Sequence, residues 1–437
     1  MRANNTKVLV LGDDHRMMLP IIRSLGRRGI HVHVAWCSPD NPARASRYIA
    51  QAHGLSSYVS GQSQWLADLN QLLEQQQFDL TIPATEAAVH ILQTHRDDLV
   101  HSDRIYLLDD DAFRVVTSKS RTSALAASLD IPCPRSIQVE RDSDVRSLVD
   151  QMQLPVVIKP CSSVRDEQQL TKHFVRTADT LDDAVAYLNY LAEQGADALI
   201  QQRFVGEGVG VELLAKDGEV LVGIQHRRLH ETNGHGSTYR ETTPIHDALR
   251  RASEQLVEAL NYTGVAMIEF RIDPESGDWV LLEINGRFWG SLPLAVAAGA
   301  DFPSYLFEML VNGKTEFSQA FRIGVRSRNL TDDIRWMWRS LLGKGKSFAE
   351  ENENCLGWSV NPISNSQFVK DLFRGLLMFD HIDTFNWTDP APAAFELRQI
   401  LASVFSGLMS RLRRGKRADE SHDNSVPGLP TSAEPSI

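Results

Sequence analysis

The stretch "LLEINGRFWGS", Leu281–Ser291, places Glu283 and Asn285 in a segment that otherwise has the apolar pattern of a buried strand. The preceding segment "VAMIEFRID", Val265–Asp273, carries Glu269 in the same kind of environment. A carboxylate inside an apolar strand is costly unless a partner compensates for its lost hydration. A cation or hydrogen-bond donor must therefore lie beside these carboxylates. Identifying that group indicates both the fold of this region and its chemistry.

Strand geometry predicts how these polar side chains are arranged. Residues two apart on a strand point to the same face, so Glu283 and Asn285 share a face. The intervening "DPESGDW" predicts a turn, and the resulting hairpin brings Glu269 across from them. Three converging oxygen ligands are typical of a Mg²⁺ site, and Arg287 follows the strand where it can hold a phosphate oxygen. Taken singly, each of these residues is explained more simply as a polar group at the sheet edge that pairs with Arg271 or Arg287. Three such side chains on one face of the sheet favour a metal site instead.

Length and composition limit the classes of protein to consider. A chain of 437 residues predicts two or three domains. The net charge of −11, from 45 basic and 56 acidic residues, argues against a general nucleic-acid binder. The four cysteines are far apart and form no CxxC pair, so we expect neither a zinc site nor a disulfide framework, and a reducing compartment fits best.

Targeting and membrane signals are weak in this sequence. The first apolar run, in "KVLVLG", has only five residues and is too short for the apolar region of a signal peptide. No segment approaches 18 consecutive apolar residues. We therefore expect a cytoplasmic protein without a transmembrane segment.

The first part of the chain alternates between strand and helix patterns. Strands are predicted at "KVLVLG", "IHVHVAWC", "FDLTIPAT" and "RIYLLDD", with helical segments between them. This alternation predicts a parallel sheet whose ligands bind at the carboxyl ends of the strands. The glycine fingerprint of a dinucleotide site is missing after the first strand, which reads "GDDHRMM", so a classical NAD site is not expected.

The pattern changes near Asp111. One helix is predicted over 112–130, and "LPVVIKP" is predicted as a strand. The turn "KDG" predicts a hairpin between two strands, and this middle region is expected to be mostly antiparallel. Helices are expected near 330–345 and 395–417. The second has an apolar stripe and ends in the basic "RLRRGKR"; packing on the body is favoured, with contact to an anionic membrane surface as the alternative.

The segment "EFRID…WVLLEINGRFWGSLPLAVAAGADFP" resembles the C-terminal signature of ATP-grasp enzymes. Further motifs occur in that family's order, and together they most resemble carboxylate–amine ligases related to the carbamoyl phosphate synthetase large subunit. The resemblance implies a combined α/β and α+β fold. It places a Rossmann-like domain at 1–110 and an ATP-grasp domain at 111–313, with subdomains 111–200 and 201–313. Beyond it, the helical patterns predict a mostly helical extension at 314–417, and the polar, proline-containing end predicts a disordered tail at 418–437.

The resemblance also implies roles for the polar residues of the two predicted strands and for the arginine that follows them. Glu269 and Glu283 would be metal ligands, with Glu283 bridging two ions, and Asn285 would be the third ligand. Arg287 would contact the phosphoryl group in transfer. The expected cofactors are ATP and Mg²⁺, with Mn²⁺ as an alternative metal.

The nucleotide would be held by residues upstream of this segment. Lys119 and Lys159 resemble the two lysines that reach the ATP phosphates, and the linker in "LIQQRFVGEG" resembles the one that pairs with adenine. The implied nucleotide contacts there are Gln202, Arg203, Phe204, Val205 and, for the ribose, Glu207. Independently, an ammonium in the apolar strand around Lys159 needs an anionic partner, although a lysine snorkelling at the strand end explains it equally well. The segment "KPCSSVRDEQQLTKHF" departs from the family because it lacks glycine.

The loop "RRLHETNGHGSTYRE" is interpreted as the wall for the acceptor substrate. Arg228, Ser237 and Arg240 suit an anionic carboxylate or acyl phosphate, and His235 could act as a base near neutral pH. A flexible hairpin connection is an equally weighted alternative for this loop.

The function expected from this set is an ATP-dependent ligase that activates a small carboxylate as an acyl phosphate and joins it to an amine. A degenerate ATP-grasp module that binds nucleotide or a partner without catalysis is the alternative. Phosphorylation of a carboxylate or carbamate without ligation is a third. Small-molecule substrates are the expected partners, and the sequence predicts neither their identity nor the oligomeric state.

Overall fold

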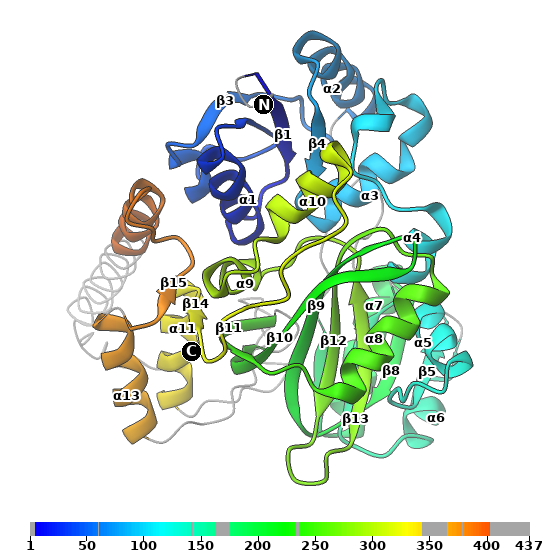
Figure 1. Ribbon diagram of the computed structural model, residues 1–437. Helices are drawn as coiled ribbons and strands as arrows, with labels where there is room; N and C mark the ends of the chain where they lie inside the picture. Colours follow the sequence, from blue (N-terminus) through cyan, green and yellow to red (C-terminus); the bar gives the residue numbers. More distant parts are fainter. Residues whose placement is uncertain are drawn as a thin grey trace, which may run out of the picture.

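The computed structural model of the 437-residue chain describes residues 5–59, 61–140, 143–161, 175–232, 236–342, 365–377 and 379–402. These described residues form three sheets (Figure 1). The first is parallel, with strand order β3-β2-β1-β4, which confirms the parallel sheet predicted from the alternation of strands and helices. Its elements are β1 Lys7–Leu11, α1 His15–Arg27, β2 His31–Ala35, β3 Ile49–His53, α2 Gln62–Gln76, β4 Leu80–Pro83 and α3 Glu86–Thr94.

Both faces of this parallel sheet are covered by helices. Val8 and Val10 of β1 pack in the same core as the apolar side of α1, whereas Leu9 and Leu11 pack in a second core with α2 and α3. Strands buried on both faces are expected to be continuously apolar, as "VLVL" is. The strand expected at "RIYLLDD" is reduced to an isolated bridge between Thr81 and Ile105.

The single helix expected over 112–130 is two helices, α4 Asp110–Val116 and α5 Lys119–Ser128. The first helix ends at its C-cap Thr117. Ser118 caps the second, because its side chain accepts a hydrogen bond from the backbone N–H of Arg121. A serine that caps a new helix competes with continuation of the old one. This break makes Lys119 the first residue of α5.

A small antiparallel sheet follows, with strand order β5-β8-β6-β7. Its apolar face packs against α6 and α7 in a core of its own. The bounds are β5 Ser136–Val139, α6 Val145–Asp150, β6 Val156–Pro160, β7 Arg176–Ala178, α7 Leu181–Glu193 and β8 Ala198–Gln202. The strand predicted at "LPVVIKP" is β6, and it carries Lys159.

The third sheet has seven strands in the order β13-β12-β9-β10-β11-β14-β15. Its strands are antiparallel except for the pair β14–β15, and α8 packs on it. The predicted hairpins are present at β9–β10 and β12–β13. The bounds are β9 Glu207–Lys216, β10 Glu219–Thr232, β11 Gly236–Thr243, α8 Asp247–Ala259, β12 Gly264–Ile272, β13 Trp279–Asn285, β14 Arg326–Arg328 and β15 His381–Ile382.

The C-terminal part contains the helices α9 Leu292–Ala298, α10 Phe302–Asn312, α11 Leu330–Leu342 and α13 Asn365–Leu376. It also supplies β14 and β15 to the edge of the large sheet, which the sequence did not suggest because both strands are only two or three residues long. Residues 391–402 are helical, and Leu397 and Leu401 of the predicted apolar stripe are 51% and 59% exposed, so packing is not seen at these two residues. Ile400 of the same stripe is partly buried, and the residues of the stripe after Leu401 lie outside the described residues.

Among the described residues, none of the helices is individually long and apolar enough to cross a membrane. One sharply bent pair, Leu292–Ala298 with Phe302–Asn312, meets the length and composition criteria jointly. Leu292, Ala295, Phe302 and Leu306 of this pair belong to the main hydrophobic core.

Candidate functional site

The two strand carboxylates face each other across the β12–β13 hairpin. Glu269 and Glu283 are direct cross-strand partners, and a bulge follows Glu269. Asn285 lies two residues after Glu283, and its side-chain amide donates to Glu269 Oε1 at 3.2 Å and to Glu283 Oε1 at 3.3 Å. The structure therefore brings together the three predicted metal ligands on one face of the sheet.

These three side chains suit a divalent ion chemically. Among the described residues no group of three His, Cys, Asp or Glu side chains could hold a metal, so the oxygen of Asn285 would have to complete the set. In this structure that oxygen accepts a hydrogen bond from Arg287 Nη2 at 3.0 Å, and the amide nitrogen faces the carboxylates. Two carboxylates and one amide oxygen on adjacent strands match the hard ligands of Mg²⁺, provided that the amide turns over.

Arg287 stands at the carboxyl end of β13, just beyond this set. Its guanidinium also pairs with Glu86 Oε2 at 3.2 Å and donates to the carbonyl of Phe288 at 2.9 Å. Glu86 is the first residue of α3, directly after β4 in the parallel sheet. The contact therefore joins the parallel sheet to the large sheet at the site.

Lysines from the small sheet and from α5 provide the opposite charge. Lys159 is only 7% exposed, and burial lowers the pKa of its ammonium to about 8, although the charges of Glu283 and Glu269 act against that shift. Burial alone would raise the pKa of Glu283, but Lys119 and Lys159, together with Asn285 and Arg287, outweigh it and lower that pKa. Lys119 lines the same pocket as Glu283, and both predicted phosphate-binding lysines interact electrostatically with that carboxylate.

Arg228 lies at the carboxylate set, on β10. Its Nη2 is 2.5 Å from Glu269 Oε2, and its Nη1 is 3.9 Å from Glu231. The charges of Glu269 and Glu231 raise its pKa against the opposing effect of burial. Gly208 makes room for this pair, because a Cβ there would overlap the carboxylate of Glu231 and meet Arg228 Cδ at 2.8 Å.

The remaining residues predicted for the acceptor wall do not converge on this set. Arg240 is fully buried, and its Nη2 binds Asp383 Oδ2 at 2.5 Å. The hydroxyl of Ser237 donates to the carbonyl of Tyr239 at 2.8 Å. Because its charge is already matched by a buried carboxylate, Arg240 acts in this structure as a structural ion pair. His235 lies outside the described residues, as does most of the glycine-free segment after Lys159.

The linker expected to contact adenine runs from the end of β8 to the start of β9. The backbone N–H groups of Gln202 and Arg203 donate to the carbonyls of Arg135 and Pro155 at 2.8 and 3.4 Å. Phe204 is partly buried, and Val205 is 75% exposed. Glu207 is half-exposed and 3.9 Å from Arg227. The first two backbone N–H groups of this linker thus already donate hydrogen bonds to carbonyls of the protein.

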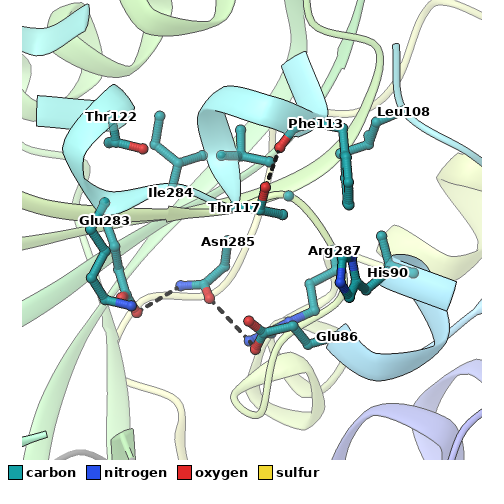
Figure 2. Close-up of a pocket in the computed structure, with 14 residues that line it drawn as sticks. Glu86, His90, Leu108, Phe113, Thr117, Thr122, Glu283, Ile284, Asn285 and Arg287 are labelled. Carbon is teal, nitrogen blue, oxygen red and sulfur yellow. Dashed lines mark hydrogen bonds and ion pairs between the residues drawn. The ribbon is translucent and has the colours of Figure 1, made fainter. Parts of the chain in front are cut away.

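A pocket opens beside the carboxylate set, with about 770 Å³ of empty space that is partly open to solvent. Figure 2 shows Glu283, Asn285, Arg287 and Glu86 along one side, with Phe113 and Leu108 across from them. The pocket is also lined by Val89, His90, Val116, Thr117, Lys119, Thr122, Ile284 and Gly286. Glu86 was not singled out from the sequence, although its position at the carboxyl end of β4 is where parallel sheets bind ligands.

The segment after Arg287 is anchored beneath the site. Ser291 donates to Glu212 Oε1 at 2.7 Å, and His226 Nδ1 lies 2.9 Å from the same oxygen. Glu212 and His226 are both buried, and a Cβ on Gly210 would overlap the ring of His226. This buried network fixes the chain that carries Arg287 to the centre of the large sheet.

Comparison with known families and curated proteins gives the following relatives. Residues 194–332 match a family model described as "ATP-grasp in the biosynthetic pathway with Ter operon". The chain is 24% identical to a carbamoyl phosphate synthase large chain, C-terminal section, of Methanopyrus kandleri, over 52% of this chain and 40% of that protein. It is 21% identical to a D-aspartate ligase of Enterococcus faecium, over 63% and 68%, and 30% identical to a D-alanine–D-alanine ligase of Chromohalobacter salexigens, over 44% and 63%. The chain thus spans about two fifths to two thirds of the length of these relatives.

Solved structures share the fold. An L-amino acid ligase from Bacillus licheniformis aligns with a TM-score of 0.56 and 14% identity, over 74% of this chain and 79% of that one. N5-carboxyaminoimidazole synthetase from Staphylococcus aureus aligns with a TM-score of 0.58 and 14% identity, over 84% and 96%. A biotin carboxylase domain from Hydrogenobacter thermophilus, in complex with MgADP, ADP and bicarbonate, aligns with a TM-score of 0.58 and 13% identity, over 74% and 73%.

Proposed function

Since the chain carries an ATP-grasp family domain, we propose that it is an ATP- and Mg²⁺-dependent ligase. In this proposal it activates a small-molecule carboxylate as an acyl phosphate and joins it to an amine. The relatives named above include ligases of this type, and one aligned structure holds MgADP. The carboxylate and the amine themselves are not identified by these similarities.

The observation that carries the proposal is the charge arrangement between the two antiparallel sheets. Glu269 and Glu283 lie opposite each other on the large sheet, and Lys159 of the small sheet is close enough to change the pKa of Glu283. A protein that needed these groups only for stability would be better served by apolar residues, because buried ion pairs rarely stabilise more than a packed core does. The arrangement supports binding of a charged ligand, such as a triphosphate with its metal.

Each residue has a role in this proposal. Glu269, Glu283 and Asn285 would hold Mg²⁺, which when bound would neutralise charge on the phosphates and favour their transfer. Lys119 and Lys159 would bind phosphate oxygens as point charges. Arg287 would hold the transferred phosphoryl group, and the linker from Gln202 to Glu207 would line the nucleoside.

The proposed reaction has two steps. An oxygen of the substrate carboxylate attacks the γ-phosphorus of ATP, the bond from that phosphorus to the β-phosphate oxygen breaks, and ADP leaves. The amine nitrogen then attacks the acyl carbon and loses a proton, and inorganic phosphate leaves with the former carboxylate oxygen. Positioning and electrostatic stabilisation are what the protein contributes to such a transfer.

A nucleotide-binding module without catalysis is the second candidate. The engaged N–H groups of Gln202 and Arg203 favour it to a degree, because they reduce the donors available to an adenine ring. The retained pair Glu269 and Glu283 weighs against it, since a module that does not bind metal has no use for two partly buried carboxylates side by side.

The test is ADP formation by the purified full chain with ATP and Mg²⁺, against a panel of small carboxylates with and without amines. We expect turnover that needs Mg²⁺, and new amide masses when an amine is present. Glu283→Gln should lower kcat by about 100-fold or more, whereas the exposed-helix control Glu254→Gln should not. Tight ATP binding with no turnover for any acid, in wild type and Glu283→Gln alike, would instead support the module.

A further inference from the structure

The pocket beside Arg287 has a distribution of charged and apolar side chains that the proposed reaction alone does not explain. One side carries a single ion pair, Arg287 with Glu86, whose side chains are 18% and 28% exposed and therefore reachable by a ligand. Leu108 and Phe113 lie across from this pair (Figure 2). Val89, Val116 and Ile284 add further apolar lining, and the polar lining also includes Thr117, Lys119 and Thr122. A polar end and an apolar body in one cavity are typical of small-molecule sites.

The ion pair determines which ligand charge the pocket accepts. A ligand with a carboxylate alone would pair with Arg287 but leave Glu86 unpaired beside a second negative charge. A ligand with an ammonium alone would leave Arg287 unpaired. A zwitterion replaces the Arg287–Glu86 contact with two contacts, so every charge remains paired in a partly desolvated place.

The other charged groups that face the pocket do not alter this balance. Glu283 lies beside Lys119 and Lys159, which lower the pKa of its carboxyl group and so match its charge. The side-chain oxygen of Asn285 accepts from Arg287 and orients the guanidinium. The ring of His90 stacks on Phe113 with 5.9 Å between centroids, which gives that end of the pocket a flat aromatic surface.

We propose that this pocket binds the carboxylate substrate as an α-amino acid with an aliphatic or aromatic side chain. Its carboxylate lies at Arg287, its α-ammonium at Glu86, and its side chain between Phe113, Val116 and Ile284. Glu86 is then a specificity-determining residue. The inference rests on the proposed function in that the bound carboxylate is the one to be phosphorylated, and it adds the class of acid.

Binding of the amino acid is measured first, without ATP, by isothermal titration of the full chain. The probes are leucine and phenylalanine, each as both enantiomers, with 4-methylpentanoate and 3-phenylpropanoate as matched acids that lack the ammonium. We expect one enantiomer of an amino acid to bind at least about tenfold more tightly than its matched acid, because a charge-assisted contact is lost in the acid. Equal or weaker binding of the amino acid would overturn the inference.

The variant Glu86→Gln distinguishes two roles for Glu86, which are binding of the substrate ammonium and positioning of the Arg287 guanidinium. If Glu86 binds the ammonium, this variant loses about tenfold in affinity for the amino acid and does not lose affinity for the matched acid, which now meets an unpaired Arg287. If Glu86 only positions Arg287, both affinities fall together, and the inference is wrong. Glu254→Gln, an equivalent change on the exposed face of α8, is the control and leaves both affinities unchanged.

The same probes in the ADP-formation assay separate this inference from the proposed function. Turnover with apolar amino acids supports both. Turnover only with acids that lack an α-ammonium keeps the ligase and overturns the pocket assignment. Amino-acid binding that depends on Glu86 but is followed by no turnover keeps the pocket assignment and removes the ligase.

Discussion

At the scale of single residues, Lys159 shows what burial does to a charged side chain. Its ammonium lies on a strand of apolar side chains, and its desolvation lowers the pKa to about 8. Without a ligand, the charged form costs stability below that pH. Since the unfolded chain binds more protons between pH 8 and 10.5, this group makes the free energy of unfolding rise with pH over that window.

The same shift predicts how nucleotide binding depends on pH. A phosphate favours the protonated lysine, so the affinity of wild type for MgATP should fall as pH rises above 8, by up to about tenfold per unit. Lys159→Arg keeps its charge and should bind with nearly constant affinity from pH 7 to 9.5. Isothermal titration across this range is the measurement. A wild-type affinity that does not change with pH would show that Lys159 does not meet the phosphates.

The sequence indicated some residues of the site better than others. Glu269, Glu283 and Asn285 were predictable because strand periodicity fixes which side chains share a face, and the turn between the strands fixes their register. Glu86 was not predictable from the sequence, because only the three-dimensional packing of the parallel sheet on the large sheet brings it to Arg287. Arg240 looked like a ligand contact because its buried partner Asp383 is 143 residues away in the sequence.

At the scale of elements, Gly286 governs how closely the end of β13 approaches α4. A Cβ on this residue would lie 2.8 Å from Val116 Cγ2 and 3.0 Å from Leu108 Cδ1, closer than normal contact distance. The backbone between Asn285 and Arg287 can therefore pack against the pocket wall only because residue 286 has no side chain. The "NGR" motif needs its glycine for this contact.

We expect Gly286→Ala to lower the free energy of unfolding by about 1–3 kcal/mol, the usual cost of overpacking. Urea denaturation of both proteins measures this difference. Gly54→Ala is a matched control, because a Cβ at Gly54 would meet no atom within 4 Å, and it should change stability by about 0.5 kcal/mol or less. Equal effects of the two substitutions would contradict the close approach.

The helices α11 and α13 are attached to the large sheet through His230 of β10. Its Nδ1 lies 2.7 Å from Asp333 of α11, and its Nε2 lies 3.4 Å from Asp371 of α13. Its ring stacks on Trp336 with 3.9 Å between centroids. Burial lowers the pKa of this imidazole, but the hydrogen bonds and charges of the two aspartates outweigh burial and raise it.

A raised folded-state pKa gives a definite sign to the pH dependence of this attachment. The stabilisation is complete below the unfolded pKa near 6.5 and is lost as pH rises through the folded value. Between pH 6.5 and 9, the free energy of unfolding of wild type should therefore fall more than that of His230→Gln. Urea denaturation at matched pH values measures both. Parallel curves for the two proteins would mean that His230 is neutral in the fold.

Elements were predicted where their pattern is long and local. The hairpins β9–β10 and β12–β13 followed from alternating apolar residues around clear turns. The break between α4 and α5 was missed because an apolar helical pattern continues through Ser118, whose capping role competes with it. The strands β14 and β15 were missed because so short a strand has no periodicity and exists only through its neighbours in the sheet.

At the scale of the whole molecule, buried ion pairs connect parts that are far apart in the chain. Arg23 of α1 pairs with Asp389 at 2.9 Å, and Arg240 of β11 pairs with Asp383 at 2.5 Å. Arg328 of β14 binds Asp380 at 2.6 Å. The C-terminal segment is thus held against both the parallel sheet and the large sheet, on which Glu269 and Glu283 stand.

Loss of one such carboxylate should be costly because it leaves a guanidinium buried and unpaired. We expect Asp383→Asn to lower the free energy of unfolding by about 3 kcal/mol. The same change at Asp278, an exposed aspartate in the β12–β13 turn, should cost about 0.5 kcal/mol or less. Thermal and urea denaturation of the two variants test this. A neutral Asp383→Asn would mean that the C-terminal segment contributes little to the fold.

The central claim is that the site transfers the γ-phosphate of ATP to a carboxylate oxygen and then releases it on attack by an amine. It is tested most directly with a substrate acid labelled with ¹⁸O in both carboxylate oxygens, by ³¹P NMR of the phosphate released with ATP, Mg²⁺ and the amine. Each released phosphate should carry one ¹⁸O, because the bond from the acyl carbon to the former carboxylate oxygen is the one that breaks. Amide formation with phosphate that carries no ¹⁸O would contradict it.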